Sequence, residues 1–234
     1  MSHINDNAGK MRQGACPPVS KRRENMTYSK TDLPEKVQMY LEEIFNDEDL
    51  LDAFFNCDIE IYDEDWILDL DMDEELQDLM GPSDCGYESI KAFARDGSGA
   101  LWVVLNDEYI GYIGTEGECG IVARNIDEFM NMAALGRYVC EYWDMDILQS
   151  EDDFAEKLAE PVEDENDKKF VHFIEKHGFT TDTHELYEMI IKGLTVEPAL
   201  FFPATEDGEY CDSNSLLGFE DDQESLEELK KLIK

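Results

Sequence analysis

Apolar side chains recur at intervals of three and four residues in the first part of the chain, a spacing that predicts helices. The first set is Leu33, Val37, Tyr40, Leu41, Ile44 and Phe45. Pro34 falls in the first turn of this helix, where its missing N–H is tolerated. A shorter helix is predicted by the next set, which is Leu50, Leu51, Phe54 and Phe55.

The segment from Asp58 to Glu75 alternates acidic and apolar residues. A strand with one buried face produces such alternation, because successive side chains point to opposite faces of a sheet. An acidic start of a helix through Glu75–Met80, ended by Gly81–Pro82, explains the same pattern. The pattern alone leaves both interpretations open.

The middle of the chain predicts an antiparallel meander. Four short runs are rich in β-branched and aromatic residues: Ile90–Arg95, Ala100–Leu105, Tyr109–Ile113 and Cys119–Arg124. The connectors between them are 96–99, 106–108 (Asn-Asp-Glu) and 114–118. The first and the last contain Gly97, Gly99, Gly114 and Gly117, and glycine readily takes the positive φ that tight turns need. We expect these glycines to lie in turns, some of them with positive φ.

Helical spacing returns after the last predicted strand. Asn125 is placed to cap a helix that ends at Gly136, and Arg137–Leu148 predicts a further helix. Ser150 is placed to cap Glu151–Glu160. Three more apolar sets predict helices: one ends at Gly178, one ends at Gly193, and one contains Leu226, Leu229, Leu232 and Ile233.

These elements predict an α+β fold, an antiparallel β-meander packed against helices, with a mainly helical C-terminal extension. We divide the chain into a flexible basic arm (1–32), an α+β domain (33–148) and an acidic extension (149–234). The arm is polar, lacks a sustained period and ends after Met26, an alternative natural start. The extension either packs on the first unit or forms a small helical domain.

The charge of the chain limits the kinds of molecule that it can bind. The sequence has 19 Lys+Arg against 57 Asp+Glu, a formal net charge of −38. Such a field repels nucleic acid and anionic membranes, so we expect neither as a partner. No Lys or Arg occurs from Val37 to Ile90. Surfaces that serve only solubility usually mix both signs, so this one-sign stretch favours a cationic partner over a solubility coat.

The cysteines and the apolar runs predict a cytoplasmic protein. The six cysteines show no Cys-x-x-Cys pair, which is typical of reduced thiols. Residues 1–30 carry basic side chains but no apolar run of the kind a signal peptide needs. The longest uncharged apolar run, Ala100–Leu105, is too short to span a bilayer.

Each candidate catalytic or metal-binding motif departs from the residue pattern that its chemistry requires. Asp69, Asp71 and Asp73 resemble the start of an EF-hand loop, but Glu74 stands at the glycine position and Met80 at the glutamate position. His172 and His177 are five residues apart, so a helix does not place them on one face as metal ligands. We therefore expect no enzyme activity, no cofactor and no bound metal.

Two runs of the middle segment resemble the core of the SUKH superfamily: FARDGSGALWVVL (Phe93–Leu105) and IGYIGTEGECGIVARNIDEFMNMAALG (Ile110–Gly136). The resemblance is good over Ile90–Gly136 and loose over Leu33–Gly136. It implies helices packed on an antiparallel sheet. Many bacterial members of this superfamily are immunity proteins that neutralise a cognate polymorphic toxin, often a nuclease. The yeast-type relatives, cell-wall-synthesis regulators among them, serve other purposes.

Charge and resemblance together predict a non-catalytic immunity protein that inhibits a basic, nuclease-type toxin domain through protein–protein interaction. The expected contact residues are Asp63, Glu64, Asp65, Trp66, Asp69, Asp71, Asp73, Glu116 and Glu118. Trp66 fits an aromatic anchor and equally fits an ordinary core residue. Two other classes stay open: an acidic Ca²⁺-binding or carboxylate-dependent enzyme, and a regulatory scaffold of the same fold. The oligomeric state is not predicted.

Overall fold

A computed structural model describes residues 33–61, 87, 89–115, 118–162, 166–197, 199–200, 216 and 222–232. The predicted basic arm, the whole of the acidic alternation after Ile61 and the alternative helix through Glu75–Met80 lie outside these residues. Within them the chain forms one antiparallel sheet and a set of helices, so the predicted α+β fold is confirmed.

The sheet is a meander in which each strand pairs with the next along the chain, in the order β1-β2-β3-β4-β5. Its strands are β1 (Glu60–Ile61), β2 (Ile90–Arg95), β3 (Leu101–Leu105), β4 (Tyr109–Ile113) and β5 (Cys119–Ala123). The four predicted strands are therefore confirmed. The acidic alternation contributes β1, whose Glu60 pairs with Arg95 of β2.

The helices are α1 (Glu35–Asn46), α2 (Glu48–Asn56), α5 (Ile126–Ala133), α6 (Met145–Leu148), α7 (Glu151–Ala159), α8 (Asn166–His177), α9 (Thr183–Leu194) and α10 (Asp222–Leu232). Asn125 and Ser150 cap α5 and α7 as predicted, because their side chains accept backbone N–H bonds from Glu128 and Asp153. The predicted single helix over Arg137–Leu148 is wrong. This segment is a 3₁₀ helix, Val139–Trp143, followed by the one-turn α6.

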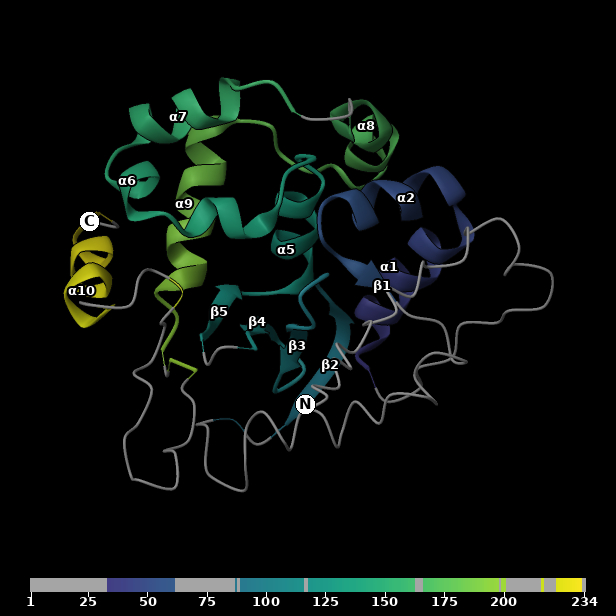
Figure 1. Cartoon of the computed structure of the whole chain (residues 1–234), viewed down its shortest axis with the longest axis horizontal. Helices are drawn as coiled ribbons and strands as arrows, with labels where there is room; N and C mark the ends of the chain where they lie inside the picture. Colours follow the sequence, from purple (N-terminus) through teal and green to yellow (C-terminus); the bar gives the residue numbers. More distant parts are fainter. Residues whose placement is uncertain are drawn as a thin grey trace, which may run out of the picture.

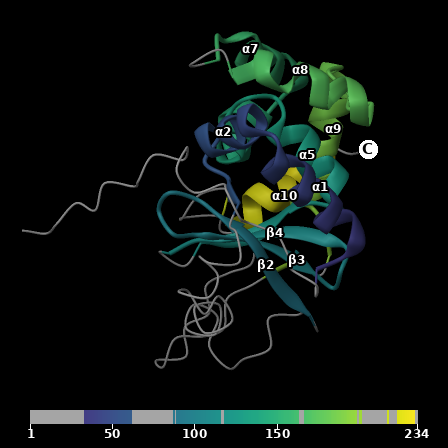
Figure 2. The same cartoon turned by 90° about the vertical axis from the view of Figure 1, so that its right-hand side faces the viewer.

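The helices gather over one face of the sheet (Figures 1 and 2). The main core lies between that face and the helices, and it includes side chains from the first and the last described helix. Its members include Leu41 of α1, Phe129 of α5, Ile190 of α9 and Leu229 of α10. A second cluster lies on the other face, where Leu101, Val103 and Leu105 pack with Tyr87 and Leu200, among others. Strand β3 is thus buried on both faces, which explains its unbroken apolar run. Within the described ranges, the helices lack the length and apolar composition needed to cross a membrane.

The tight turns use two kinds of residue. Gly99 has a φ of 98°, as expected for a glycine in the β2–β3 turn. The β3–β4 turn instead places Asn106 (φ 51°) and Asp107 (φ 59°) at its centre, with the N–H of Glu108 donating to the carbonyl of Leu105 at 3.0 Å. Positive φ at both central residues is the requirement of a type I′ turn, which asparagine and aspartate also meet.

The β2–β3 turn is organised by the buried carboxylate of Asp96. One oxygen accepts from the Ser98 N–H (2.8 Å), the Ser98 hydroxyl (2.6 Å) and the Ala100 N–H (2.9 Å). The other accepts from the Tyr112 hydroxyl at 2.7 Å, which ties the turn to β4. Four donors offset the cost of burying this charge.

Helix α9 lies against β5 through a glycine. The predicted stop at Gly193 is wrong, because α9 continues through it and ends at Leu194. A Cβ at position 193 would lie 2.9 Å from the carbonyl carbon of Val122 and 3.1 Å from the Cα of Ala123. Glycine at this position therefore allows the helix and strand backbones to touch.

Replacing Gly193 by alanine should lower the free energy of unfolding by about 2 kcal/mol, because the added methyl group collides with the backbone of β5. In a helix with free space, the same change would raise stability by up to about 1 kcal/mol. The sign of the change in urea unfolding therefore tests the contact. Gly178→Ala gives the size of a purely backbone effect, since a Cβ there meets no atom within 4 Å and costs only the strain of its φ of 65°, about 1 kcal/mol, so the loss at Gly193 should be the larger of the two.

Replacing Asp96 by alanine should destabilise the chain by about 3 kcal/mol, because two backbone N–H groups and two hydroxyls lose their acceptor. Asp96→Asn should cost clearly less, since its amide oxygen still accepts the backbone bonds of the turn. Urea unfolding of both variants measures the difference. Equal losses in the two variants would contradict the role given to these hydrogen bonds.

Candidate protein-interaction surface

Of the nine predicted contact residues, Glu118 lies within the described residues. Its side chain is half-buried and packs against Gly114, so closely that a Cβ at position 114 would overlap it. The carbonyl of Glu118 also accepts from the Gly114 N–H at 2.7 Å. The other eight predicted contact residues lie outside the described residues: Asp63, Glu64, Asp65, Trp66, Asp69, Asp71, Asp73 and Glu116.

The start of the acidic alternation is described, and its position is fixed by two contacts. Asp58 follows α2 in the left-handed region (φ 62°), and its Oδ1 accepts from the N–H of Gly97 at 2.8 Å. Glu60 Oε2 lies 3.4 Å from Nε of Arg95 on the neighbouring strand. These two contacts place Asp58 and Glu60 beside the β2–β3 turn and strand β2.

Asp58 and Glu60 line a cavity of about 560 Å³, which we call the Phe55–Tyr138 cleft. Its walls come from the end of α2, the β2–β3 turn, the segment from Gly136 to Glu141 and the segment from Lys157 to Val162. The sequence pattern did not predict this cleft, because it joins four segments that are far apart along the chain.

Two large aromatic side chains on the walls of the cleft are exposed to solvent. Phe55 is 55% exposed and Tyr138 is 46% exposed. Phe55 was predicted on the apolar face of its helix, but the buried side chains of α2 are Leu50, Ala53 and Phe54. Exposed aromatic rings beside charged groups are typical of protein interfaces.

The cations of the cleft are already bound by its carboxylates. Arg137 is buried, donates to the carbonyl of Glu160 and lies 3.8 Å from Glu141. The Lys157 ammonium lies 2.9 Å from Glu160 and 3.0 Å from Glu141, and these hydrogen bonds raise its pKa. The cleft thus holds four carboxylates against two engaged cations, and its charge is negative.

The Glu60 carboxyl lies in an unfavourable site for a charge. Burial raises its pKa, and the neighbouring carboxylates of Asp58 and Asp96 raise it further, while Arg95 offsets part of this effect. A cation that entered the cleft would relieve this crowding.

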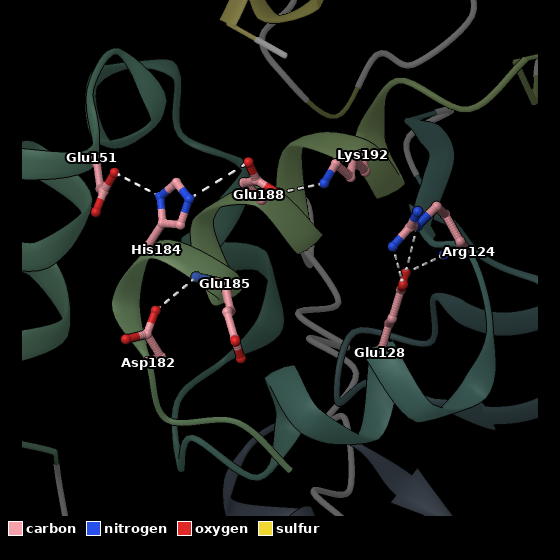
Figure 3. Close-up of polar contacts among 8 residues, drawn as sticks. All are labelled: Arg124, Glu128, Glu151, Asp182, His184, Glu185, Glu188 and Lys192. Atoms are coloured by element: carbon pink, nitrogen blue, oxygen red, sulfur yellow. Dashed lines mark hydrogen bonds and ion pairs between the residues drawn. The ribbon is translucent and has the colours of Figure 1, made fainter. Parts of the chain in front are cut away.

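A second polar cluster lies between α7 and α9 (Figure 3). His184 Nδ1 is 2.9 Å from Glu151, and Nε2 is 3.6 Å from Glu188, which also pairs with Lys192. The hydrogen bond to Glu151 raises the pKa of His184. These groups are exposed and pair with one another, so the cluster links the surfaces of α7 and α9 and contributes little to stability.

Figure 3 also shows Arg124, whose backbone N–H (3.0 Å) and guanidinium both donate to Glu128 in the first turn of α5. This pairing links the end of β5 to the start of α5.

His177 has a structural role at the end of α8. Its Nε2 lies 3.0 Å from Glu43 of α1, and its ring packs against Tyr40, Phe173 and Phe179. His172 is exposed on the same helix. Across the described residues, no three His, Cys, Asp or Glu side chains are grouped to hold a metal ion. The EF-hand-like Asp69, Asp71 and Asp73 lie outside that part of the chain.

Replacing Glu60 by glutamine should raise the free energy of unfolding at pH 7, because the amide removes a charge that its surroundings disfavour. The folded-state pKa of Glu60 lies above its ordinary value of 4.5, so the native chain gains stability from this group as the pH falls through the folded-state pKa. The advantage of Glu60→Gln should therefore shrink between pH 7 and pH 4.5 in urea unfolding. A variant less stable than the native chain at pH 7 would show that the Arg95 ion pair dominates.

Comparisons with known proteins give no match: no protein-family model, no curated protein and no solved structure matches this chain. The resemblance to the SUKH superfamily, which was read from Phe93–Leu105 and Ile110–Gly136, stays a prediction.

Proposed function

We propose that this chain is a non-catalytic inhibitor of the immunity-protein type, which binds a basic toxin domain through an acidic surface. The observation that carries the proposal is the distribution of charge. The chain has a net charge of −38, and the stretch from Val37 to Ile90 lacks Lys and Arg. Residues 37–61 of this stretch are described, and two of their acidic residues, Asp58 and Glu60, line the Phe55–Tyr138 cleft.

A nuclease-type toxin has the surface chemistry that fits such an inhibitor. An enzyme that binds phosphates presents cationic side chains, and a surface rich in carboxylates competes for them. Opposite fields also steer the encounter, with association rates up to about 10⁸–10⁹ M⁻¹s⁻¹ at low salt. Fast capture suits an inhibitor that must act before its target does.

The SUKH resemblance is part of this proposal, and its motif residues have identifiable roles in the fold. Asp96 and Gly99 shape the β2–β3 turn, and Asn125 caps α5. In this proposal these residues hold the fold, and the contact with the partner is made by the acidic surface. We place the protein in the cytoplasm of a bacterium, within a polymorphic toxin system.

The proposal is tested with the toxin domain of the neighbouring gene. Expression of that domain alone should stop growth of a host, and coexpression of this chain should restore it. The purified pair should form a stable complex whose association rate falls as salt is added. Absence of a toxin gene beside this one, or growth arrest that coexpression leaves unchanged, would overturn the proposal.

Reversing charge on the acidic segment should weaken that complex. Asp63→Lys with Asp65→Lys should slow association by about tenfold at low salt and flatten its salt dependence, because steering depends on the local field. Stopped-flow mixing measures both effects. Glu118 is left unchanged, since its side chain packs on Gly114.

The matched control is Glu175→Lys with Glu185→Lys, which makes the same change of net charge at two exposed residues of α8 and α9. This control should slow association much less. Equal slowing by both double variants would mean that net charge alone drives the encounter, and that the acidic segment is not the contact surface.

A further inference from the structure

The Phe55–Tyr138 cleft combines three properties that define the chemistry of what it binds. Two aromatic side chains on its walls are about half exposed, its charge is negative, and its volume of about 560 Å³ lies in the range of ligand-binding pockets. An aromatic ring is attracted to a cation placed over its face, and a carboxylate nearby adds to that attraction.

Asp58 supplies a carboxylate oxygen to this cleft. Its Oδ1 is held by the N–H of Gly97, and among the described residues its Oδ2 has no partner. The contact with Gly97 fixes the side chain, so a cation would meet an acceptor that is already oriented. Glu60 stands on the same wall.

The cations on the walls oppose an anionic ligand. Arg137 and Lys157 direct their N–H groups to Glu141 and to the side chain and carbonyl of Glu160. A phosphate or a carboxylate that entered the cleft would have to displace these bonds and would meet Asp58 and Glu60. Charge complementarity therefore favours a cation.

Arginine fits these walls better than lysine. A guanidinium group is planar, stacks on aromatic rings and donates several hydrogen bonds in one plane, whereas an ammonium is a compact and strongly hydrated charge. Lysine would gain from the carboxylates alone, while arginine would gain from the carboxylates and the rings.

We propose that the Phe55–Tyr138 cleft is a recognition pocket for an arginine side chain on the protein partner, held between its aromatic rings and the carboxylates of Asp58 and Glu60. This inference rests on the proposed function, because it assigns a chemistry to one part of the contact with a basic partner. In this inference the aromatic contact residues are Phe55 and Tyr138, whereas the sequence pattern had predicted Trp66.

The test compares two peptides of equal charge, hexa-arginine and hexa-lysine, binding to the full chain in calorimetry at low salt. The native chain should bind hexa-arginine about threefold to fivefold more tightly than hexa-lysine, the gain expected from cation–π contact at an exposed site. In Phe55→Ala with Tyr138→Ala, the ratio of the two dissociation constants should fall to about one. Hexa-lysine affinity should change less than about twofold, because the charges remain.

The control variant is Met39→Ala with Val171→Ala, which removes two other exposed apolar side chains and should leave the ratio unchanged. Asp58→Asn keeps the acceptor for Gly97 and removes the charge, so it should weaken both peptides while the ratio persists. If the double alanine variant does not fold, a point that near-ultraviolet circular dichroism checks, the single variant Phe55→Leu decides the question, because it keeps an apolar side chain, removes one ring and should move the ratio toward one.

An arginine preference that survives the loss of both rings, or no preference in the native chain, would overturn this inference. Neither result affects the proposed function, which the toxin rescue experiment decides. Conversely, an arginine preference that depends on the two rings, with no effect on the toxin of the neighbouring gene, would leave the pocket in place and reject the immunity role.

Discussion

The buried carboxylate of Asp96 determines how the parts of this domain meet. It closes the β2–β3 turn through Ser98 and Ala100 and reaches across to the hydroxyl of Tyr112. The Tyr112 ring in turn packs against Trp102 and Trp143, with ring centroids 4.9 Å and 5.0 Å apart. One charged group thus links a turn, two strands and the 3₁₀ helix. The same turn presents the N–H of Gly97 to Asp58, which ties the end of α2 to the sheet.

Local patterns were sufficient to predict most of the fold. The four long strands alternate with turn residues, and the caps at Asn125 and Ser150 depend on side chains a few residues away. Such features are encoded within a short stretch, so one sequence reveals them. The β3–β4 turn was predicted as a turn, although its positive φ angles fall on Asn106 and Asp107 rather than on glycine.

Features that depend on distant segments were not predictable. Gly193 looks like a helix stop in the sequence, and only the backbone of β5 beside it explains why it lies inside α9. Phe55 follows the apolar spacing of α2, yet tertiary packing buries Phe54 and leaves Phe55 at the rim of the cleft. Composition predicted an acidic interaction surface. Composition does not show which aromatic residues lie beside the carboxylates, because the cleft brings the end of α2 together with a segment that follows about eighty residues later in the chain.

The contact between Gly193 and Val122 bears on how this protein changes over evolutionary time. The backbones of α9 and β5 touch at Gly193, so no larger side chain fits at that position. Changes in the C-terminal helices and in the sheet must therefore be compatible with each other. Neither part is free to be exchanged for a module from another protein, because any replacement helix would need a glycine at the point of contact.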